Sequence, residues 1–482
     1  MTWLFVAASG YHRRPMRGLV ILSSLVVVLD LGMGLSLGGC GGCNDDSKVG
    51  QLPDAPPGAD ARADAIPPDA VSLVVINHGV PAVGVTVYFL NADGSVAKTG
   101  VTDGNGIATA VITTGGSVTA IRPFTTPPPP AGKFAPDELR TFLGVKPGDH
   151  LVLSRAAVDT VTVAFDAAAP DGGDFATSYQ VFTTCGGGPN TITPGNSGNG
   201  SGSPDPGGTL DLQNCHGAAD IAVVAAEQQV LARAGGNAVE VPQGLYHANA
   251  TLPPGGNVML SLRDDTYADL TDITFTYTNA PDATITVLHS PVLTNGFLGP
   301  YSTTAGGSAT ISEVAVPATM EVVDSSLTLN NFHEVIDWGP YSTAYNLDLM
   351  NVLLREVTGG PAFDQPTGKI SWTEATDGAT PSLTIAGILV RRPDPLAKWH
   401  WELVAPYSPN GIVLPHLPTD VFDWAPGPND EIQSLDPIKN VQVTGGYDAV
   451  RSHILDIHDE TGPTGYVIGN AGRAVIATSA LP

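Results

Sequence analysis

Apolar and polar residues alternate along most of the chain after residue 71, in short runs that end at turn-forming residues. Residues 85–89 read Val-Thr-Val-Tyr-Phe and lead into an Asn-Ala-Asp-Gly turn at 91–94, and a second turn at 102–106 precedes the apolar run 107–112. A period of two places successive side chains on opposite faces of a strand, and Asn/Asp-Gly turns favour hairpins. The pattern predicts an all-β chain of tandem antiparallel β-sandwiches.

Two segments interrupt this alternation. Residues 218–234 are rich in alanine and fit either a helix or a strand. Residues 343–356 carry apolar side chains at spacings of three and four, which favours a short helix. The remaining runs after residue 266 again alternate as strands do.

Composition supports many short strands rather than helical bundles. Gly (56) and Pro (41) supply about a fifth of the 482 residues, and only 14% of residues are charged. The formal net charge is −26. Because an acidic surface repels phosphate backbones, this charge excludes nucleic acid as a partner. No glycine triplet or heptad period occurs, which excludes collagen-like and coiled-coil classes.

The first forty residues have the pattern of an export signal. Three arginines between residues 13 and 17 precede the apolar run 19–37, which ends in Leu-Gly-Gly-Cys at 37–40. This ending resembles the lipobox of bacterial lipoproteins. The resemblance implies that residues 1–39 are removed and that Cys40 becomes the lipidated N-terminal residue. The membrane is then a partner through this lipid, and two or three acyl chains anchor a protein stably.

Other interpretations of the leader remain open. A retained transmembrane helix would place Asp30 near its centre, at a cost of about 2.5–3.5 kcal/mol. An ordinary secretory signal would require an A-x-A-like cleavage site, which the leader lacks. Translation from Met16 would give a leader of more usual length. In the lipoprotein interpretation Gly41, rather than Asp, follows the cysteine, which favours the outer membrane or the cell surface.

The mature chain begins with a tether and a first sandwich. Residues 40–70 are Gly, Pro, Asp and Ala with few large apolar side chains, so they cannot offset the entropy of ordering. We therefore expect a disordered tether. Residues 81–87 and the Thr-Asp turn at 102–106 resemble carboxypeptidase regulatory-like and related immunoglobulin-like domains. The resemblance implies a seven-stranded sandwich over residues 71–155, used as a spacer or an adhesion module.

The next region, residues 156–265, contains two cysteines that flank a Gly/Ser-rich loop. Cys185 and Cys215 stand on either side of residues 186–208. In an exported protein this pair is expected to form a disulfide, and closing the loop contributes about 3.6 kcal/mol by the chain-entropy relation. A thiolate metal site is the alternative, but only His216 is nearby as a further ligand.

Tryptophan gathers in the C-terminal region, residues 266–482, which is expected to be β-rich and to form one sandwich or two. Trp399 and Trp401 are two residues apart and share one face of a strand. They form either part of a sandwich core or an exposed platform on which sugar rings stack. The Trp-containing strands around residues 369–372 and 399–407 loosely resemble a fibronectin type III-like module, which favours the core. A short Gly-Pro-Tyr-Ser-Thr segment at 299–303 recurs at 339–343 without a longer repeat around it.

Few residues have the spacing of a catalytic or metal site. Residues 333–337 (His-Glu-Val-Ile-Asp) resemble a zincin helix with Asp replacing the second His, and a Pro at 340 would end any such helix. His453 and His458 are five apart, which does not align them on a strand or a helix. The acidic residues at 456–460 fit a solvated turn, with Ca²⁺ binding as the alternative. We expect no cofactor and assign no catalytic or metal residue.

These features favour a lipid-anchored lipoprotein of the outer membrane or cell surface. Its expected role is non-catalytic: adhesion, ligand binding, or a structural role in the envelope, with a glycan or a surface protein as the partner. A cell-surface hydrolase whose catalytic residues lie on sandwich loops remains the alternative, because loop residues need no local signature. The sequence therefore leaves enzymatic activity open, with the non-catalytic role favoured.

Overall fold

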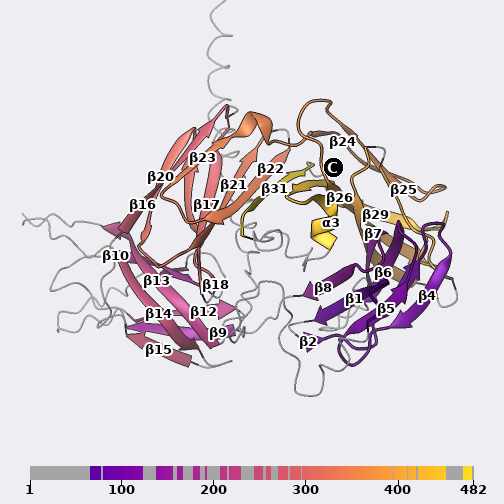
Figure 1. Cartoon of the computed structure of the whole chain (residues 1–482), viewed down its shortest axis with the longest axis horizontal. Coiled ribbons are helices and arrows are strands. Elements are labelled where there is room, and N and C mark those ends of the chain that lie inside the picture. Colours follow the sequence, from indigo (N-terminus) through magenta and orange to yellow (C-terminus); the bar gives the residue numbers. More distant parts are fainter. Residues whose placement is uncertain are drawn as a thin grey trace, which may run out of the picture.

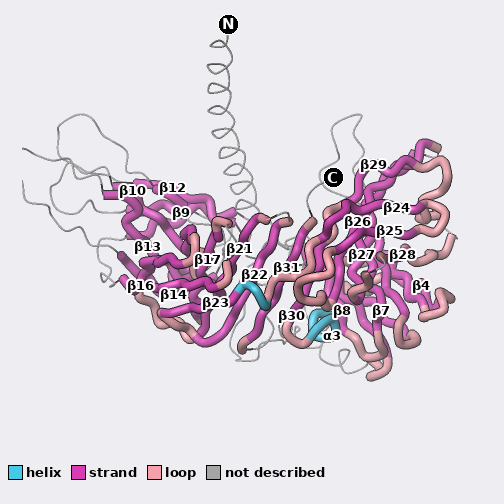
Figure 2. The backbone as a smooth tube through the Cα atoms, turned by 90° about the horizontal axis from the view of Figure 1, so that it is seen from above, coloured by secondary structure: helices cyan, strands magenta, loops and turns pink. Residues whose placement is uncertain are grey.

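The described chain is almost entirely strand. The computed structural model describes residues 66–479, apart from gaps at 78–79, 123–136, 156–159, 167–176, 185–189, 193–206, 214–216, 229–243, 253–256, 262–269, 281–282, 295, 330, 395, 410, 420–421 and 452–469. Figure 2 shows strands and loops, with a 3₁₀ turn η1 (Leu349–Asn351) and a short helix α3 (Gly446–Arg451). The prediction of an all-β sandwich fold is confirmed.

The first sandwich has one sheet of three main strands, to which the short β2 is added, and a second sheet of four strands. In the first of these, β1 lies between β5, which is antiparallel to it, and β8, which is parallel. The second sheet has the order β4-β3-β6-β7, and the short β2 pairs with β1. The strands are β1 (Ala70–Asn77), β2 (Val80–Pro81), β3 (Thr86–Leu90), β4 (Val96–Val101), β5 (Ile107–Val111), β6 (Gly116–Arg122), β7 (Asp137–Val145) and β8 (His150–Arg155).

The second sandwich repeats this arrangement. Its first strand, β9, lies between the antiparallel β12 and the parallel β15, and the other sheet has the order β11-β10-β13-β14. The strands are β9 (Thr160–Asp166), β10 (Thr177–Thr183), β11 (Asn190–Ile192), β12 (Gly207–Gln213), β13 (Gly217–Gln228), β14 (Gly244–Leu252) and β15 (Asn257–Ser261).

The third sandwich has the same arrangement again. Here β16 lies between the antiparallel β20 and the parallel β23, and β17 is flanked by β19 and β21, with β22 beyond β21. The short β18 also pairs with β17. The strands are β16 (Leu270–Thr278), β17 (Ile285–Leu293), β18 (Gly296–Phe297), β19 (Tyr301–Ala305), β20 (Ser308–Val314), β21 (Met320–Thr328), β22 (Phe332–Pro340) and β23 (Ala344–Asp348).

The fourth sandwich follows this order for six strands and then departs from it. The sheet β27-β26-β30-β31 matches the four-stranded sheets, and β25 pairs with β28 as β1 pairs with β5. Beside β25, however, the place of the parallel last strand is taken by the antiparallel β24, which precedes β25 in the chain. The strands are β24 (Val357–Asp364), β25 (Lys369–Glu374), β26 (Leu383–Pro393), β27 (Leu396–Pro406), β28 (Ile412–Val413), β29 (Glu431–Leu435), β30 (Lys439–Val443) and β31 (Gly472–Thr478).

Two strand pairs join three of these sandwiches into one sheet. β27 of the fourth sandwich runs parallel to β7 of the first, and β31 of the fourth runs antiparallel to β22 of the third. The four-stranded sheets of the first, fourth and third sandwiches, together with the short β18 and with β29, which pairs with β26, therefore form one 14-stranded sheet. Figure 1 shows the result as an arch, with the first and second sandwiches at its two lower ends. Phe182 of the second sandwich stacks on Tyr301 of the third at 4.0 Å between ring centroids.

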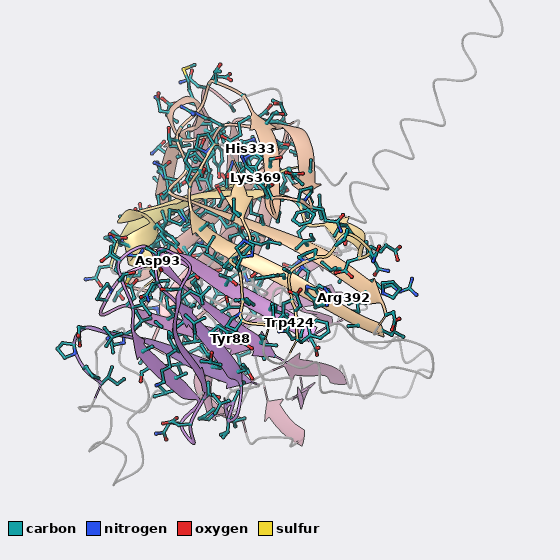
Figure 3. The ribbon with its side chains drawn as sticks, turned by 90° about the vertical axis from the view of Figure 1, so that its right-hand side faces the viewer. Tyr88, Asp93, His333, Lys369, Arg392 and Trp424 are labelled. Atoms are coloured by element: carbon teal, nitrogen blue, oxygen red, sulfur yellow. The ribbon has the colours of Figure 1, made fainter. Side chains whose placement is uncertain are left out.

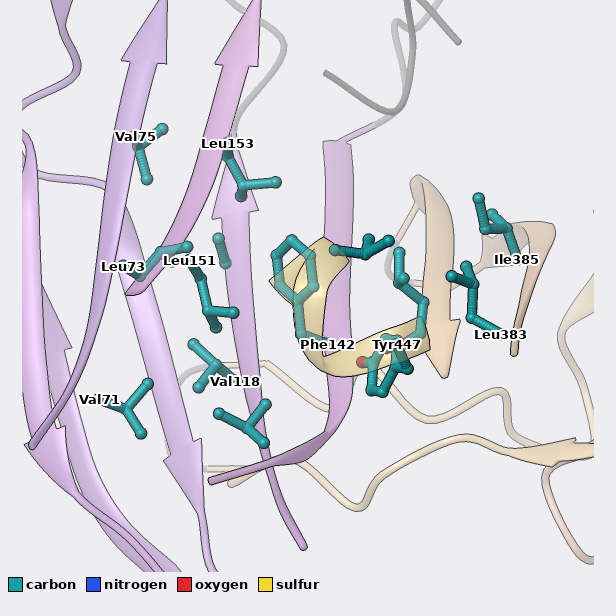
Figure 4. Close-up of a cluster of buried hydrophobic side chains, with 14 of the residues drawn as sticks. Val71, Leu73, Val75, Val118, Phe142, Leu151, Leu153, Leu383, Ile385 and Tyr447 are labelled. Carbon is teal, nitrogen blue, oxygen red and sulfur yellow. Dashed lines mark hydrogen bonds between the residues drawn. The ribbon is translucent and has the colours of Figure 1, made fainter. Parts of the chain in front are cut away.

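The apolar core is continuous across the join between the first and fourth sandwiches. Leu73 and Leu151 from the three-stranded sheet pack toward Phe142 of β7, and the same cluster reaches Tyr447 of α3 and Leu383 of β26 (Figure 4). The hydroxyl of Tyr447 donates to the carbonyl oxygens of residues 143 and 404, at 2.6 and 3.2 Å. The helix thus fastens the ends of β7 and β27 together.

Two expectations about helices need comment. Residues 343–356 do not form the predicted helix: they form β23, the 3₁₀ turn and the loop after it. The spacing of three and four reflected a bend, because Leu347, Leu349 and Leu354 enter one core while Met350 is 68% exposed. Residues 217–228 form β13, so this alanine-rich segment is a strand, which is one of the two structures that its sequence allowed. The sequence pattern gave no indication of α3.

Candidate functional site

Several residues to which the sequence assigns chemistry lie outside the described part of the chain. These are Cys40, Cys185, Cys215, His453 and His458. The lipid attachment and the disulfide therefore stay predictions from the sequence.

The two central tryptophans are core residues. Trp399 and Trp401 on β27 are both 0% exposed. The indole of Trp401 donates to Thr141 Oγ1 at 2.9 Å, and the Trp399 ring meets Trp424 edge to face at 5.9 Å. The guanidinium of Arg392 lies over the Trp399 ring at 5.1 Å. The interpretation of this pair as an exposed ligand platform is therefore wrong, because neither ring has a free face.

The aromatic group around Trp399 is closed by an arginine whose donors are used. Arg392 binds Asp430 through Nε at 2.9 Å and Nη2 at 2.7 Å, and it donates to the carbonyl oxygens of Asp423 and Ala425. Figure 3 shows Arg392 and Trp424 close to each other at this edge of the molecule. The arrangement holds the loop 422–430 against the sandwich, which is a structural role.

A row of five charged side chains crosses the 14-stranded sheet on the side that faces the core cluster of Leu73, Phe142 and Tyr447. Its members are Arg140 on β7, Glu402 on β27, Lys439 on β30, Glu334 on β22 and Asp324 on β21. Each lies two residues from an apolar side chain of the core cluster on the same strand, so all five project from the same face. The row therefore runs through all three sandwiches and over both joins.

An ion pair occupies the join between the first and fourth sandwiches. Arg140 and Glu402 are paired in the register of β7 with β27, and their Nε and Oε1 atoms are 2.8 Å apart. The two residues are only 4% and 6% exposed. Burial lowers the pKa of Lys439, whereas the charges of Glu402 and Glu334 raise it in part. Breaking such a buried pair leaves an unpaired charge, so the pair disfavours other registers of the two strands at the join.

Two carboxyl groups meet near the other join. Burial raises the pKa of Asp324 to about 7, and burial together with the charge of Asp324 raises the pKa of Glu334 well above its usual value. A hydrogen bond links the two groups. Since like charges so close cannot both ionise in a buried site, the pair keeps a proton at neutral pH. The proton lets one carboxyl donate to the other.

A glycine makes room for a histidine–carboxylate pair beside this row. His400 Nε2 and Asp436 Oδ2 are 2.7 Å apart, directly over Gly387 of β26. A Cβ at residue 387 would lie 1.9 Å from Asp436 Oδ2, so only glycine fits. Burial lowers the pKa of His400, but the hydrogen bond and charge of Asp436 raise it overall.

A second buried cluster lies in the core of the third sandwich. His289 on β17 is 0% exposed, and its Nδ1 and Nε2 atoms lie 2.7 Å from Glu313 and 3.0 Å from Glu321. Burial alone lowers the pKa of His289, but the hydrogen bonds to the two glutamates raise it to about 9. An ionised carboxylate only accepts, so both ring nitrogens donate and the imidazolium is the form that fits. Glu313 belongs to β20, so the cluster links the two sheets.

The repeated Gly-Pro-Tyr-Ser-Thr segments converge on this cluster. The hydroxyl of Tyr341 donates to Glu313 Oε1 at 2.6 Å, and the backbone N–H of Ser342 donates to Glu321 Oε2 at 3.1 Å. The other segment supplies Tyr301, whose pKa burial and the charge of Glu313 raise. The echo in the sequence thus marks the start of β19 and the end of β22, and both segments contribute residues to one ionic cluster.

The zincin-like segment is a strand. Residues 333–337 lie in β22, where His333 and Asp337 project to one face and Glu334 to the other. Asp337 binds Arg473 of β31, with 2.8 Å from Oδ2 to Nη2. Burial lowers the pKa of His333, whose Nε2 is 3.9 Å from Glu356. Among the described residues no group of three potential ligands is placed to hold a metal ion.

These buried charges had a signal in the sequence, although a weak one. Glu334 precedes the inward Ile336 by two residues, and Arg140 precedes the inward Phe142 by two. A charged residue at a position where the alternation calls for an apolar one indicates a buried partner. That partner lies on another strand, which for Arg140 belongs to another sandwich. The partners of these charges are residues of neighbouring strands, so the arrangement links strands.

Comparisons with known proteins add little. No family model and no curated protein matches the chain. The TIE protein of Bacillus anthracis is 12% identical, with a TM-score of 0.17 and 58% of this chain and 50% of that chain covered. A leucine-rich repeat protein from Bacteroides thetaiotaomicron is 11% identical, with a TM-score of 0.17 and 40% and 26% covered.

The shaft pilin SpaA of Lactobacillus rhamnosus is 12% identical, with a TM-score of 0.13 and 40% of this chain and 98% of that chain covered. The chain spans half or less of the first two of these proteins. At TM-scores this low the likenesses carry no argument about function. Within the described residues, no helix is both long enough and apolar enough to cross a bilayer.

Proposed function

We propose that this protein is a lipid-anchored surface protein with a non-catalytic, adhesive or structural role in the envelope. The observation that carries the proposal is the 14-stranded sheet that joins three sandwiches into one body. Modules connected only by linkers move independently, whereas paired strands and a shared core hold these modules at fixed angles. A rigid arch on a tether suits a protein that presents a surface at a distance from the membrane.

The buried charges support the same proposal. Arg140, Glu402, Glu334 and Asp324 are buried at or beside the joins between sandwiches, and Lys439 is partly buried among them. Catalytic acids and bases need contact with a substrate, and these groups contact neighbouring strands. Their placement favours rigidity over turnover.

The experiment compares the full chain with Cys40→Ser in a diderm bacterial host. The unaltered protein should partition into the detergent phase and be labelled on intact cells, and these cells should attach better to glycan- or protein-coated surfaces. Cys40→Ser should shift the protein to the aqueous phase and abolish the gain in attachment, because the thioether-forming sulfur is absent. Detergent partitioning that survives Cys40→Ser would overturn the lipid anchor, and attachment that equals that of cells without the protein would overturn the adhesive role.

A further inference from the structure

We infer that the first three sandwiches are built to carry tension along the chain. The inference deepens the proposed function and rests on it for the source of the force: a membrane anchor at one end and a bound partner at the other. The mechanical property itself depends only on the order and direction of the strands.

In each of the three sandwiches, the first strand pairs in parallel with the last. In the first sandwich the β1–β8 pairing runs from Ser72 opposite His150 to Asn77 opposite Arg155. The chain enters at the beginning of β1 and leaves at the end of β8, so the two attachment points lie at opposite ends of one ladder. β9 with β15 and β16 with β23 have the same relation.

This direction decides how force loads the hydrogen bonds. Bonds between strands run roughly across the strand axes. When parallel strands are pulled from opposite ends, they slide past each other and all the bonds of the ladder are strained together. When strands are pulled from the same end, the bonds open one after another. The parallel pair therefore resists a force under which an antiparallel first–last pair would unzip.

The strand that receives the force is also well embedded. β1 lies in the middle of its sheet, with five further paired positions on β5. Val71, Leu73 and Val75 of β1 are each 0% exposed. At the end where force enters, Ser72 Oγ and His150 Nδ1 are 2.6 Å apart. Sliding β1 would have to break both ladders and expose its core side chains at the same time.

The fourth sandwich shows that this pairing is not required by the fold. It keeps the other six strand positions but has the antiparallel β24 beside its first strand. Its last strand is held differently, between β22 of the third sandwich and β30 of its own. The strand nearest to each end of the described chain is thus an interior strand, paired on both edges.

The test is single-molecule force spectroscopy on the full chain with two placements of handles. Azide-bearing residues replace Asp69 and Arg155 in one protein, and Asp69 and Pro147 in the other, so that the native cysteines stay untouched. The first pair pulls β1 and β8 from opposite ends of their ladder, and the second pair pulls them from the same end. Equal thermal midpoints for both proteins show that the substitutions leave the fold intact.

The rupture force of the first sandwich should be several-fold higher with handles at 69 and 155 than with handles at 69 and 147. Equal forces in the two placements, or a higher force in the second, would overturn the inference. The handles replace the membrane, so a failure of the anchoring experiment with Cys40→Ser would leave this ratio unchanged. The two results therefore separate the mechanical property from the proposed location.

Discussion

The cluster around His289 makes the stability of the third sandwich depend on pH in a defined window. The pKa of His289 is about 9 in the folded protein, against 6.5 for an unperturbed side chain. The folded state therefore binds more protons than the unfolded state between these values, and stability falls as the pH rises through them. The stabilisation is fully present below about pH 6.5 and is lost above about pH 9.

The magnitude follows from the size of the pKa change. At about 1.4 kcal/mol for each pH unit, the rise from 6.5 to about 9 corresponds to about 3 kcal/mol. His289 is 0% exposed, so solvent does not screen the interaction appreciably. A loss of this size is a large fraction of the stability of a single domain.

The assay is calorimetric or denaturant unfolding at intervals from pH 6 to pH 10. A variant that carries His289→Gln, Glu313→Gln and Glu321→Gln keeps polar side chains at all three positions and removes the ionisable groups. The native protein should lose about 3 kcal/mol across the window, and the triple variant should lose much less. His333→Gln is the matched control: burial lowers the pKa of His333, so its removal should leave the decline unchanged.

Two results would refute the reasoning. One is a native protein whose unfolding free energy is flat from pH 6.5 to 9, because the imidazolium would then contribute nothing. The other is a triple variant that retains the full decline, because the pH dependence would then originate elsewhere. Asp324, with a raised pKa of about 7, lowers stability as the pH rises from about 4 to 7, largely below this window. Glu334, whose pKa is also raised, is present in both the native protein and the triple variant, so the difference between the two proteins isolates the cluster around His289.

Two substitutions test the packing. Gly387→Ala should separate His400 from Asp436, lower the free energy of unfolding by about 1–3 kcal/mol and change the pKa of His400 measured by NMR. Gly100→Ala is the control, because a Cβ there would meet only a lysine carbon at 3.7 Å, and equal stability of the two variants would contradict the close approach at Gly387. Trp401→Ala should lower the free energy of unfolding by about 3–5 kcal/mol, and Trp401→Phe should lower it by about 1 kcal/mol, mostly through loss of the hydrogen bond to Thr141. A Trp401→Ala variant as stable as the native protein would contradict the place of Trp401 in the core.

Sequence reasoning was successful where the information is local. The alternation at residues 85–89 and the turn at 91–94 predict a hairpin that the structure contains as β3 and β4. The turn at 102–106 also lies between two strands, but β4 and β5 belong to different sheets and do not pair with each other. Inward and outward side chains follow from the period of two in the same way. These features depend on neighbours in the chain and are visible without any knowledge of the fold.

The repeat of the sandwich arrangement could not be found in this way. It consists of pairings such as Ser72 with His150, between strands far apart in the sequence. Different apolar residues satisfy the same pairing, so the repeat leaves no repeated letters. The ionic row was hidden for the same reason: Arg140 and Glu402 meet only because β7 and β27 pair.

The fourth sandwich joins the first and the third, so the chain forms an arch and the sandwiches do not follow one another in a linear row. In the common arrangement, the outer strand of the four-stranded sheet has an open edge, and open edges invite pairing with other chains. The fourth sandwich covers two such edges, β7 with β27 and β22 with β31.

β31 packs closely against β22, the edge strand of the third sandwich. A Cβ at Gly472 would lie 2.4 Å from the Trp338 ring, so the glycine lets β31 fit against β22. Its alternate side chains serve two cores: Ala474 and Ile476 join one cluster, and Val475 and Ala477 join the other. Because one strand continues the sheets of two sandwiches and contributes to two core clusters, their relative angle is set by backbone pairing, and the proposed load-bearing role requires such a fixed angle.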